Sequence, residues 1–140
     1  MSAALIYPTP EDAETAFYDA IAKRDLNALM NVWAEDDEII CVHPTGTQLL
    51  GFAAIQASWR GILGGVRMEI RRQRVARWHS MLISVHHLIE RLYANKEVGN
   101  PIQATHIYLR GQNGWRLTCR HASPGGAPIL KPEKERRVLH

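Results

Sequence analysis

Histidine side chains are the groups in this sequence best suited to chemistry near neutral pH. Seven are present, and an imidazole titrates at about pH 6.5, so its neutral form can take a proton from a substrate. His43 is the best candidate for such a general base, at the end of a short apolar segment. The alternative is that His43 only closes the turn before Gly46 through the backbone. The others on or beside predicted strands are His86 or His87, His106 and His121.

Strand spacing predicts where two of these histidines point. His121 has the same parity as Trp115 and Leu117, so we expect it at the cavity end of a buried strand face, as a ligand contact or as a satisfied core histidine. His86 and Glu90 also share a face, where they can form a base and its orienting carboxylate. Whether that face lines a cavity or a partner interface stays open.

Metal and cofactor chemistry finds no support in the residue spacing. The histidines are scattered, and the adjacent His86 and His87 must point to opposite faces of a strand, so they cannot chelate together. No phosphate loop, dinucleotide fingerprint or Ser-His-Asp order appears. Cys41 and Cys119 lie in apolar strand-like segments and are expected to be buried thiols. We therefore predict no metal and no cofactor.

Length and composition are those of one soluble domain. The 140 residues, 46% hydrophobic and 22% charged, are enough to bury a core. No apolar run reaches the roughly 18 residues that cross a bilayer, and no signal peptide is evident, so we expect a cytoplasmic protein without membrane contact. The net charge of +3 comes from basic residues interleaved with acidic ones, which argues against nucleic-acid binding.

The order of the predicted elements indicates an α+β fold. Thr9 and Asp25 are positioned to cap two helices, and a third runs from near Gly51 to Gly64. After that helix the pattern changes to strands at about 67–78, 81–94, 102–110 and 115–123, preceded by one short strand at 38–43. Helices followed by long strands are typical of helices packed on one face of an antiparallel sheet.

Two strand details predict more than the fold class. In the first long strand the apolar residues change parity, which indicates a bulge around 71–74, unless Arg72 or Arg74 points inward to a ligand. Strand 81–94 is apolar on both faces, although a sheet with helices on one side should be polar on the other. A second copy of the chain is the simplest cover, which predicts a homodimer through the outer sheet face.

Six short motifs recur along the chain in a characteristic order: FYDAIAKRDLNAL (17–29), WAEDD (33–37), VHP (42–44), GFAAI (51–55), GWRL (114–117) and HASP (121–124). Together they resemble the SnoaL-like and ketosteroid isomerase-like branch of the nuclear transport factor 2-like superfamily. The resemblance covers about residues 10–124. It implies a strongly bent, mainly antiparallel sheet wrapped around three N-terminal helices, a cone with an apolar cavity, and dimers through the outer face. We expect one domain at 1–125 and a C-terminal tail at 126–140.

The resemblance carries over to individual site residues only in part. Tyr18 matches the tyrosine that donates to the oxyanion in ketosteroid isomerases, while His43 stands where their aspartate base precedes a proline, and Thr105 is nearest to their second donor. A threonine hydroxyl is a weaker donor than a carboxylic acid, so steroid isomerisation is doubtful. Trp33 and Trp59 lie on helices that should cover the cavity mouth, as packing residues or as a ligand platform.

Two functions remain open at this point. The first is a module that binds a small hydrophobic molecule in an apolar cavity without chemistry. The second is a cofactor-free acid–base enzyme of isomerase, cyclase or dehydratase type, with His43 as base and Tyr18 as polarising donor. We favour the module, because only one of the three isomerase residue types is kept. The two differ in whether His43 and Tyr18 converge on one vacant point.

Overall fold

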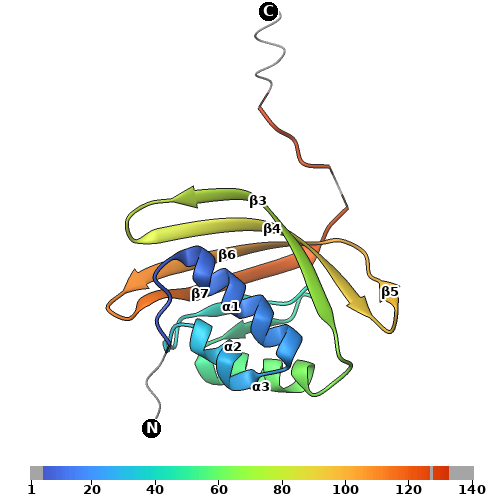
Figure 1. The fold of residues 1–140 in the computed structure, drawn as a ribbon, viewed down its shortest axis with the longest axis horizontal. Coiled ribbons are helices and arrows are strands. Elements are labelled where there is room, and N and C mark those ends of the chain that lie inside the picture. Colours follow the sequence, from blue (N-terminus) through green and yellow to red (C-terminus); the bar gives the residue numbers. More distant parts are fainter. Residues whose placement is uncertain (1–4, 127, 133–140) are drawn as a thin grey trace, which may run out of the picture.

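Three helices and seven strands form the fold in a computed structural model, which describes residues 5–126 and 128–132 (Figure 1). The predicted tail therefore lies partly outside the described residues, at 127 and 133–140. The helices are α1 (Pro10–Lys23), α2 (Leu26–Val32) and α3 (Phe52–Leu63). The strands are β1 (Ile40–Val42), β2 (Gln48–Leu50), β3 (Glu69–His79), β4 (Ile83–Ala94), β5 (Glu97–Val98), β6 (Ile102–Gly111) and β7 (Gly114–Pro124).

The first two helices begin at the predicted capping residues. Thr9 Oγ1 accepts a hydrogen bond of 3.0 Å from the backbone N–H of Asp12, and Asp25 Oδ1 accepts one of 3.0 Å from that of Ala28. Each oxygen satisfies a backbone donor that the first helical turn leaves free. Arg24 ends α1 in the left-handed region, and its side chain donates to the carbonyl oxygen of Leu63 at 2.8 Å. This contact ties the end of α1 to the end of α3.

The strands form one curled sheet in the order β2-β1-β7-β6-β4-β3, with β5 beside β4. All neighbours are antiparallel except β1 and β7, which run parallel. In Figure 1 the sheet bends around α1, and all three helices lie on the same side of it. The predicted α+β cone with a strongly bent, mainly antiparallel sheet is confirmed.

The prediction from the sequence did not include two short strands. The four long strands lie within a few residues of their predicted ranges, but β2 and β5 were not foreseen. Both are very short, and their pairing depends on neighbours that are not evident locally. β2 pairs with β1 across the turn at Gly46, whose φ of 93° is one that residues other than glycine rarely adopt. This pairing holds the end of β1 in place.

The core lies between α1 and the inner face of the sheet. Phe17 and Ile21 of α1 and Leu117 of β7 are almost completely buried there. Leu88 of β4 is also inaccessible to solvent and packs against Ala104 and Ala122 of the neighbouring strands. The inner face of β4 therefore includes Leu88 together with its alternate neighbours His86 and Glu90.

Bulges in two strands decide which side chains point inward. In β3 the register shifts between Arg74 and Ala76, close to the predicted bulge. In β7, Leu117 pairs with Tyr108 and Cys119 with Ile107, so Thr118 has no residue opposite. Side-chain alternation reverses after such an extra residue. The bulge at Thr118 therefore controls the orientation of the rest of β7.

The outer face of the sheet carries an apolar row. Trp78, Val85, Ile107 and Cys119 lie opposite one another on β3, β4, β6 and β7. Trp78 keeps 61% of its surface exposed. Within the described residues, no helix is long and apolar enough to cross a membrane. One apolar face of β4 thus packs in the core, and the other is not covered by any other part of the described chain.

Candidate functional site

A pocket of about 370 Å³ opens between α3 and the inner face of the sheet. Its walls are mainly apolar and come from elements that are far apart in sequence. α3 contributes Trp59 and Ile62, β3 contributes Ile70, β4 contributes Leu92 and β6 contributes Ile102. The polar lining residues are His43, Thr45, Thr47, Ser58, Glu90 and Arg120. The pocket thus combines an apolar body with one set of polar and charged groups.

His43 lines this pocket immediately after β1. Its backbone N–H donates to the carbonyl oxygen of Thr47 at 3.0 Å, and its own carbonyl accepts from Gly46 at 2.8 Å. The ring lies edge-on to Trp59, with centroids 5.4 Å apart, and Nε2 is 2.8 Å from Ser58 Oγ. The two readings of His43 are therefore compatible: the backbone closes the turn while the ring faces the pocket.

The environment of His43 favours its neutral form. Burial lowers the pKa of His43, because an imidazolium loses hydration there, and the positive charge of Arg120 lowers the pKa further. A ring nitrogen of the neutral form can accept a proton. His43 therefore meets the electronic requirement for a general base at neutral pH.

Glu90 and Arg120 form a buried ion pair beside His43. Arg120 Nη1 donates to Glu90 Oε2 at 2.7 Å, and Nη2 donates to Oε1 at 2.9 Å. Arg120 is 3% exposed and Glu90 is inaccessible. Burial alone would lower the pKa of Arg120, but the charge and hydrogen bonds of Glu90 outweigh burial and raise it above its usual value. Both groups line the pocket as a balanced pair of charges.

Tyr18 is hydrogen-bonded to this ion pair. Its hydroxyl donates to Glu90 Oε2, and the side chain is almost fully buried. Burial and the negative charge of Glu90 raise the pKa of Tyr18 well above its usual value, so it keeps its proton. Tyr18 is not among the residues that line the pocket, whereas His43 and Glu90 are. Tyr18, the predicted donor to a ligand, therefore donates its hydrogen bond to Glu90 instead.

His106 forms a hydrogen bond with the guanidinium of Arg120. An arginine side chain can only donate, so His106 Nε2 accepts from Arg120 Nη1 at 2.9 Å. In a neutral ring the other nitrogen, Nδ1, then carries the proton and donates to Tyr108 Oη at 2.7 Å. Burial and the charge of Arg120 hold the pKa of His106 well below its usual value. His106 orients Arg120 and does not line the pocket.

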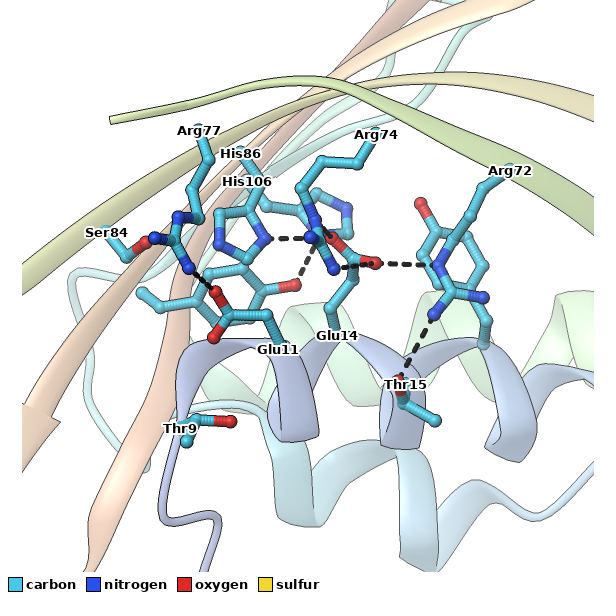
Figure 2. A network of polar contacts seen from close by, with 12 residues as sticks. Thr9, Glu11, Glu14, Thr15, Arg72, Arg74, Arg77, Ser84, His86 and His106 are labelled. Atoms are coloured by element: carbon cyan, nitrogen blue, oxygen red, sulfur yellow. Dashed lines mark hydrogen bonds and ion pairs between the residues drawn. The ribbon is translucent and has the colours of Figure 1, made fainter. Parts of the chain in front are cut away.

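A second buried carboxylate, Glu14 of α1, has a different set of partners (Figure 2). It accepts from Arg72 Nε at 2.8 Å, Arg74 Nε at 3.0 Å and His86 Nδ1 at 2.8 Å. Burial alone would raise the pKa of Glu14, but hydrogen bonds from His86, Arg74 and Arg72 hold it well below its usual range. Figure 2 shows both arginines reaching from β3 down to α1.

This cluster resolves two expectations about the sheet. The sequence offered a bulge in β3 or an inward Arg72 or Arg74 as alternatives, and the structure has both, since the two arginines point inward to Glu14. His86 and Glu90 do face the interior together, but His86 bonds to Glu14 and not to Glu90. The expected pair of His86 as base and Glu90 as orienting carboxylate is absent from the described hydrogen bonds.

His121 does not reach the cavity, which corrects the prediction from strand parity. The bulge at Thr118 reverses alternation in β7, so Arg120 turns inward and His121 is exposed on the outer face. Thr105 lies opposite His121 on the same outer face, where its hydroxyl is 3.4 Å from His87 Nδ1. Neither His121 nor Thr105 lines the pocket.

The two tryptophans have different surroundings. Trp59 forms part of the pocket wall and is 3% exposed. Trp33 is 2% exposed, ends α2 and lines a separate open groove beside the β6–β7 turn. Trp59 is therefore placed to contact a ligand of the His43 pocket, and Trp33 is not.

Sequence reasoning missed four of the six polar residues that line the pocket: Thr45, Thr47, Ser58 and Arg120. Ser58 lies one turn of α3 before Ile62, so helical spacing could have placed both on one face. Arg120 has the parity opposite to Trp115 and Leu117, which by alternation alone predicts the outer face, and the bulge turns it inward. Across the described chain, no three His, Cys, Asp or Glu side chains are grouped to hold a metal ion.

The chain belongs to a family of SnoaL-like domains. The family model matches residues 11–127. A solved structure from Thiobacillus denitrificans, described as a candidate calcium/calmodulin-dependent protein kinase type II association domain, is 37% identical with a TM-score of 0.82. The match covers 86% of this chain and 98% of that one. No curated protein matches the chain.

Two further solved structures share the fold. One from Streptomyces avermitilis, described as a candidate dehydratase of the nuclear transport factor 2-like family, is 25% identical with a TM-score of 0.74, over 85% of this chain and 100% of that one. One from Parabacteroides distasonis, described as a candidate ketosteroid isomerase, is 20% identical with a TM-score of 0.68, over 83% and 87%. These matches agree with the superfamily that the motifs indicated.

Proposed function

We propose that this domain binds a small, mainly apolar molecule in the pocket beside His43. The observation that carries the proposal is the combination of a volume of about 370 Å³, apolar walls and a grouped set of polar residues. Ligand sites in proteins commonly have this composition, with a few polar groups that orient a largely apolar ligand. Burial of the apolar part of the ligand supplies the affinity.

The pocket can be tested by filling it. Ile62→Trp places a larger side chain into the space between α3 and the sheet, and it should abolish binding of methyl hexyl ketone. Binding is followed by NMR through the indole N–H of Trp59, which belongs to the pocket wall. Leu50→Trp, at a position 66% exposed on β2, is the matched control and should bind as the wild type does. Equal binding by both variants would place the ligand elsewhere.

Acid–base catalysis is the second candidate, and one observation favours it. His43 faces the pocket with a lowered pKa, so a neutral base is available at neutral pH. The Tyr18 hydroxyl already donates its proton to Glu90, so it is not free to donate to a substrate. Ser58 and Arg120 line the pocket and are the groups that could donate a hydrogen bond to a substrate oxygen. The reaction class that fits is proton abstraction next to a carbonyl group.

This candidate has an assay that needs no natural substrate. Methyl hexyl ketone in deuterated water should exchange protons next to its carbonyl faster with the protein than without it. His43→Gln keeps size and hydrogen bonding but removes the basic nitrogen, so exchange should fall by about 10²–10⁴-fold with little change in affinity. If the wild type and His43→Gln exchange at the same rate, the domain is a binding module.

Self-association through the outer sheet face is part of this proposal. The support is the uncovered apolar row that includes Trp78, Val85 and Ile107. The similar protein from Thiobacillus denitrificans is described as a candidate association domain, which is consistent with it. Sedimentation should give twice the monomer mass of 15.8 kDa. Ile107→Arg should give a folded monomer, and a wild-type species at the monomer mass would contradict the proposal.

A further inference from the structure

We propose that Glu90 makes the pocket select uncharged ligands and reject carboxylates, an inference that rests on the proposed binding function. Arg120 is the cation of the pocket lining, and by itself it would attract an anionic head group. Both of its terminal nitrogens, however, already donate to Glu90, at 2.7 and 2.9 Å. The end-on pair of donors that would bind a ligand carboxylate is therefore occupied by a carboxylate of the chain itself.

The charge at this end of the pocket is balanced. Arg120 contributes one positive charge and Glu90 one negative charge, while the lowered pKa of His43 keeps that ring neutral. Tyr18, which faces Glu90 from α1, keeps its proton. The arginines on β3 pair with Glu14, which does not line the pocket. The polar end therefore carries no net charge for an ion to neutralise.

A ligand carboxylate in this position would lie beside the oxygens of Glu90. Both partners of the ion pair are almost inaccessible to water, so repulsion between like charges would be screened weakly. The ligand would also lose its hydration without gaining a free cation. Both the repulsion from Glu90 and the lost hydration therefore weaken the binding of an anion.

A carbonyl or ether oxygen meets neither penalty. Ser58, Thr45 and Thr47 line the pocket and have hydroxyl groups that can donate to such an oxygen. An uncharged ketone, ester or ether with an apolar body fits both the charge balance and the available donors.

Three probes of similar size test the inference on the wild type: methyl hexyl ketone, octanoate and octylammonium. At neutral pH they are neutral, negative and positive, and their affinities are compared by NMR titration on the Trp59 indole N–H. The ketone should bind at least about tenfold more tightly than either ion. Octanoate binding as tightly as the ketone, or more tightly, would overturn the selectivity while the binding function stands. If none of the probes binds, the binding function fails and the inference falls with it.

The variant Glu90→Gln identifies the cause of the selectivity. The amide oxygen can still accept from Arg120 and Tyr18, but the negative charge is gone and Arg120 is unbalanced. Octanoate should then bind at least about tenfold more tightly than to the wild type, with little change for the ketone. If the variant is less stable, octanoate should raise its melting temperature more than the ketone does.

Glu14→Gln is the matched control for this experiment. It removes a buried carboxylate from the same fold, but from a cluster that does not line the pocket. Its preference among the three probes should equal that of the wild type. If Glu90→Gln leaves octanoate binding unchanged, or if Glu14→Gln increases it equally, the selectivity does not come from Glu90 and the inference is wrong.

Discussion

The two buried carboxylates among the described residues, Glu14 of α1 and Glu90 of β4, have different partners. Glu14 accepts from two arginines of β3 and from His86, so more potential cations than anions surround it. Glu90 has one cation, Arg120, in a bidentate pair. The first arrangement joins α1 to the sheet, and the second lines the ligand pocket.

Solvent exposure adds to this difference. The arginine partners of Glu14 keep 25% and 34% of their side-chain surface exposed, so water shares the solvation of that cluster. Arg120 keeps 3%. Removing one partner of Glu14 leaves two cationic or hydrogen-bonding partners in place, whereas removing Arg120 leaves the buried Glu90 carboxylate with the Tyr18 hydroxyl and no cation. We therefore expect the Glu14 cluster to tolerate the loss of one partner and the Glu90 pair not to tolerate it.

The largest expected effect follows from breaking the Glu90 pair. Arg120→Met retains the aliphatic bulk of the arginine side chain but removes its guanidinium, so the buried Glu90 carboxylate loses its cation. This should lower the free energy of unfolding by about 3–5 kcal/mol. Urea denaturation measures the loss. The double variant with Glu90→Gln removes the stranded charge and should recover more than half of it. Equal stability of Arg120→Met and the wild type would show that the pair is not buried in solution.

A smaller effect is expected from protonating Glu14. Its pKa is lower in the folded than in the unfolded chain, so its ionised form stabilises the fold above about pH 4.3, and this contribution is lost as the pH falls below that value. Glu14→Gln cannot lose it by titration. Between about pH 6 and pH 3, the wild type should therefore lose about 2 kcal/mol more stability than Glu14→Gln. Parallel pH profiles would mean that Glu14 gains nothing from its partners.

The fold could be predicted from the sequence because its signals are local. Capping by Thr9 and Asp25, helical periodicity and the glycine turns each act within a few residues, and they gave the helices and the four long strands. Which face of β4 turns inward could not be predicted, because both faces carry apolar residues; in the structure it is the face with His86, Leu88 and Glu90. β2 and β5 were missed because so short a strand depends on its neighbours.

The site could be predicted only in part, because one bulge decides it. Parity from Trp115 onward is a sound rule until Thr118 adds an unpaired residue to β7. That insertion turns Arg120 inward and His121 outward, and nothing in the local sequence marks it. His43 and Trp59 were identified as candidates from a motif and from helical spacing, which no bulge disturbs, and both line the pocket.

A still smaller effect should come from removing one cation of the Glu14 cluster. Arg74→Ala leaves Arg72 and His86 bonded to the carboxylate, and the Arg74 side chain is one-third exposed. Partly exposed ion pairs contribute little, so the loss in unfolding free energy should be about 1 kcal/mol. This value, set beside that of Arg120→Met, tests the comparison directly. A loss as large as that of Arg120→Met would show that the Glu14 cluster has no redundancy.

The smallest effect is expected at His121, and it tests the bulge. Strand parity without a bulge would put this ring in the pocket and Arg120 on the surface, whereas the structure has the reverse. Because His121 is exposed and has no described side-chain partner, His121→Ala should change the unfolding free energy by less than about 0.5 kcal/mol. Its affinity for methyl hexyl ketone should equal that of the wild type. His43→Ala, at a ring that lines the pocket, should weaken the same ligand several-fold. If the two histidine variants lost affinity equally, β7 would be regular in solution and Arg120 would not lie beside Glu90.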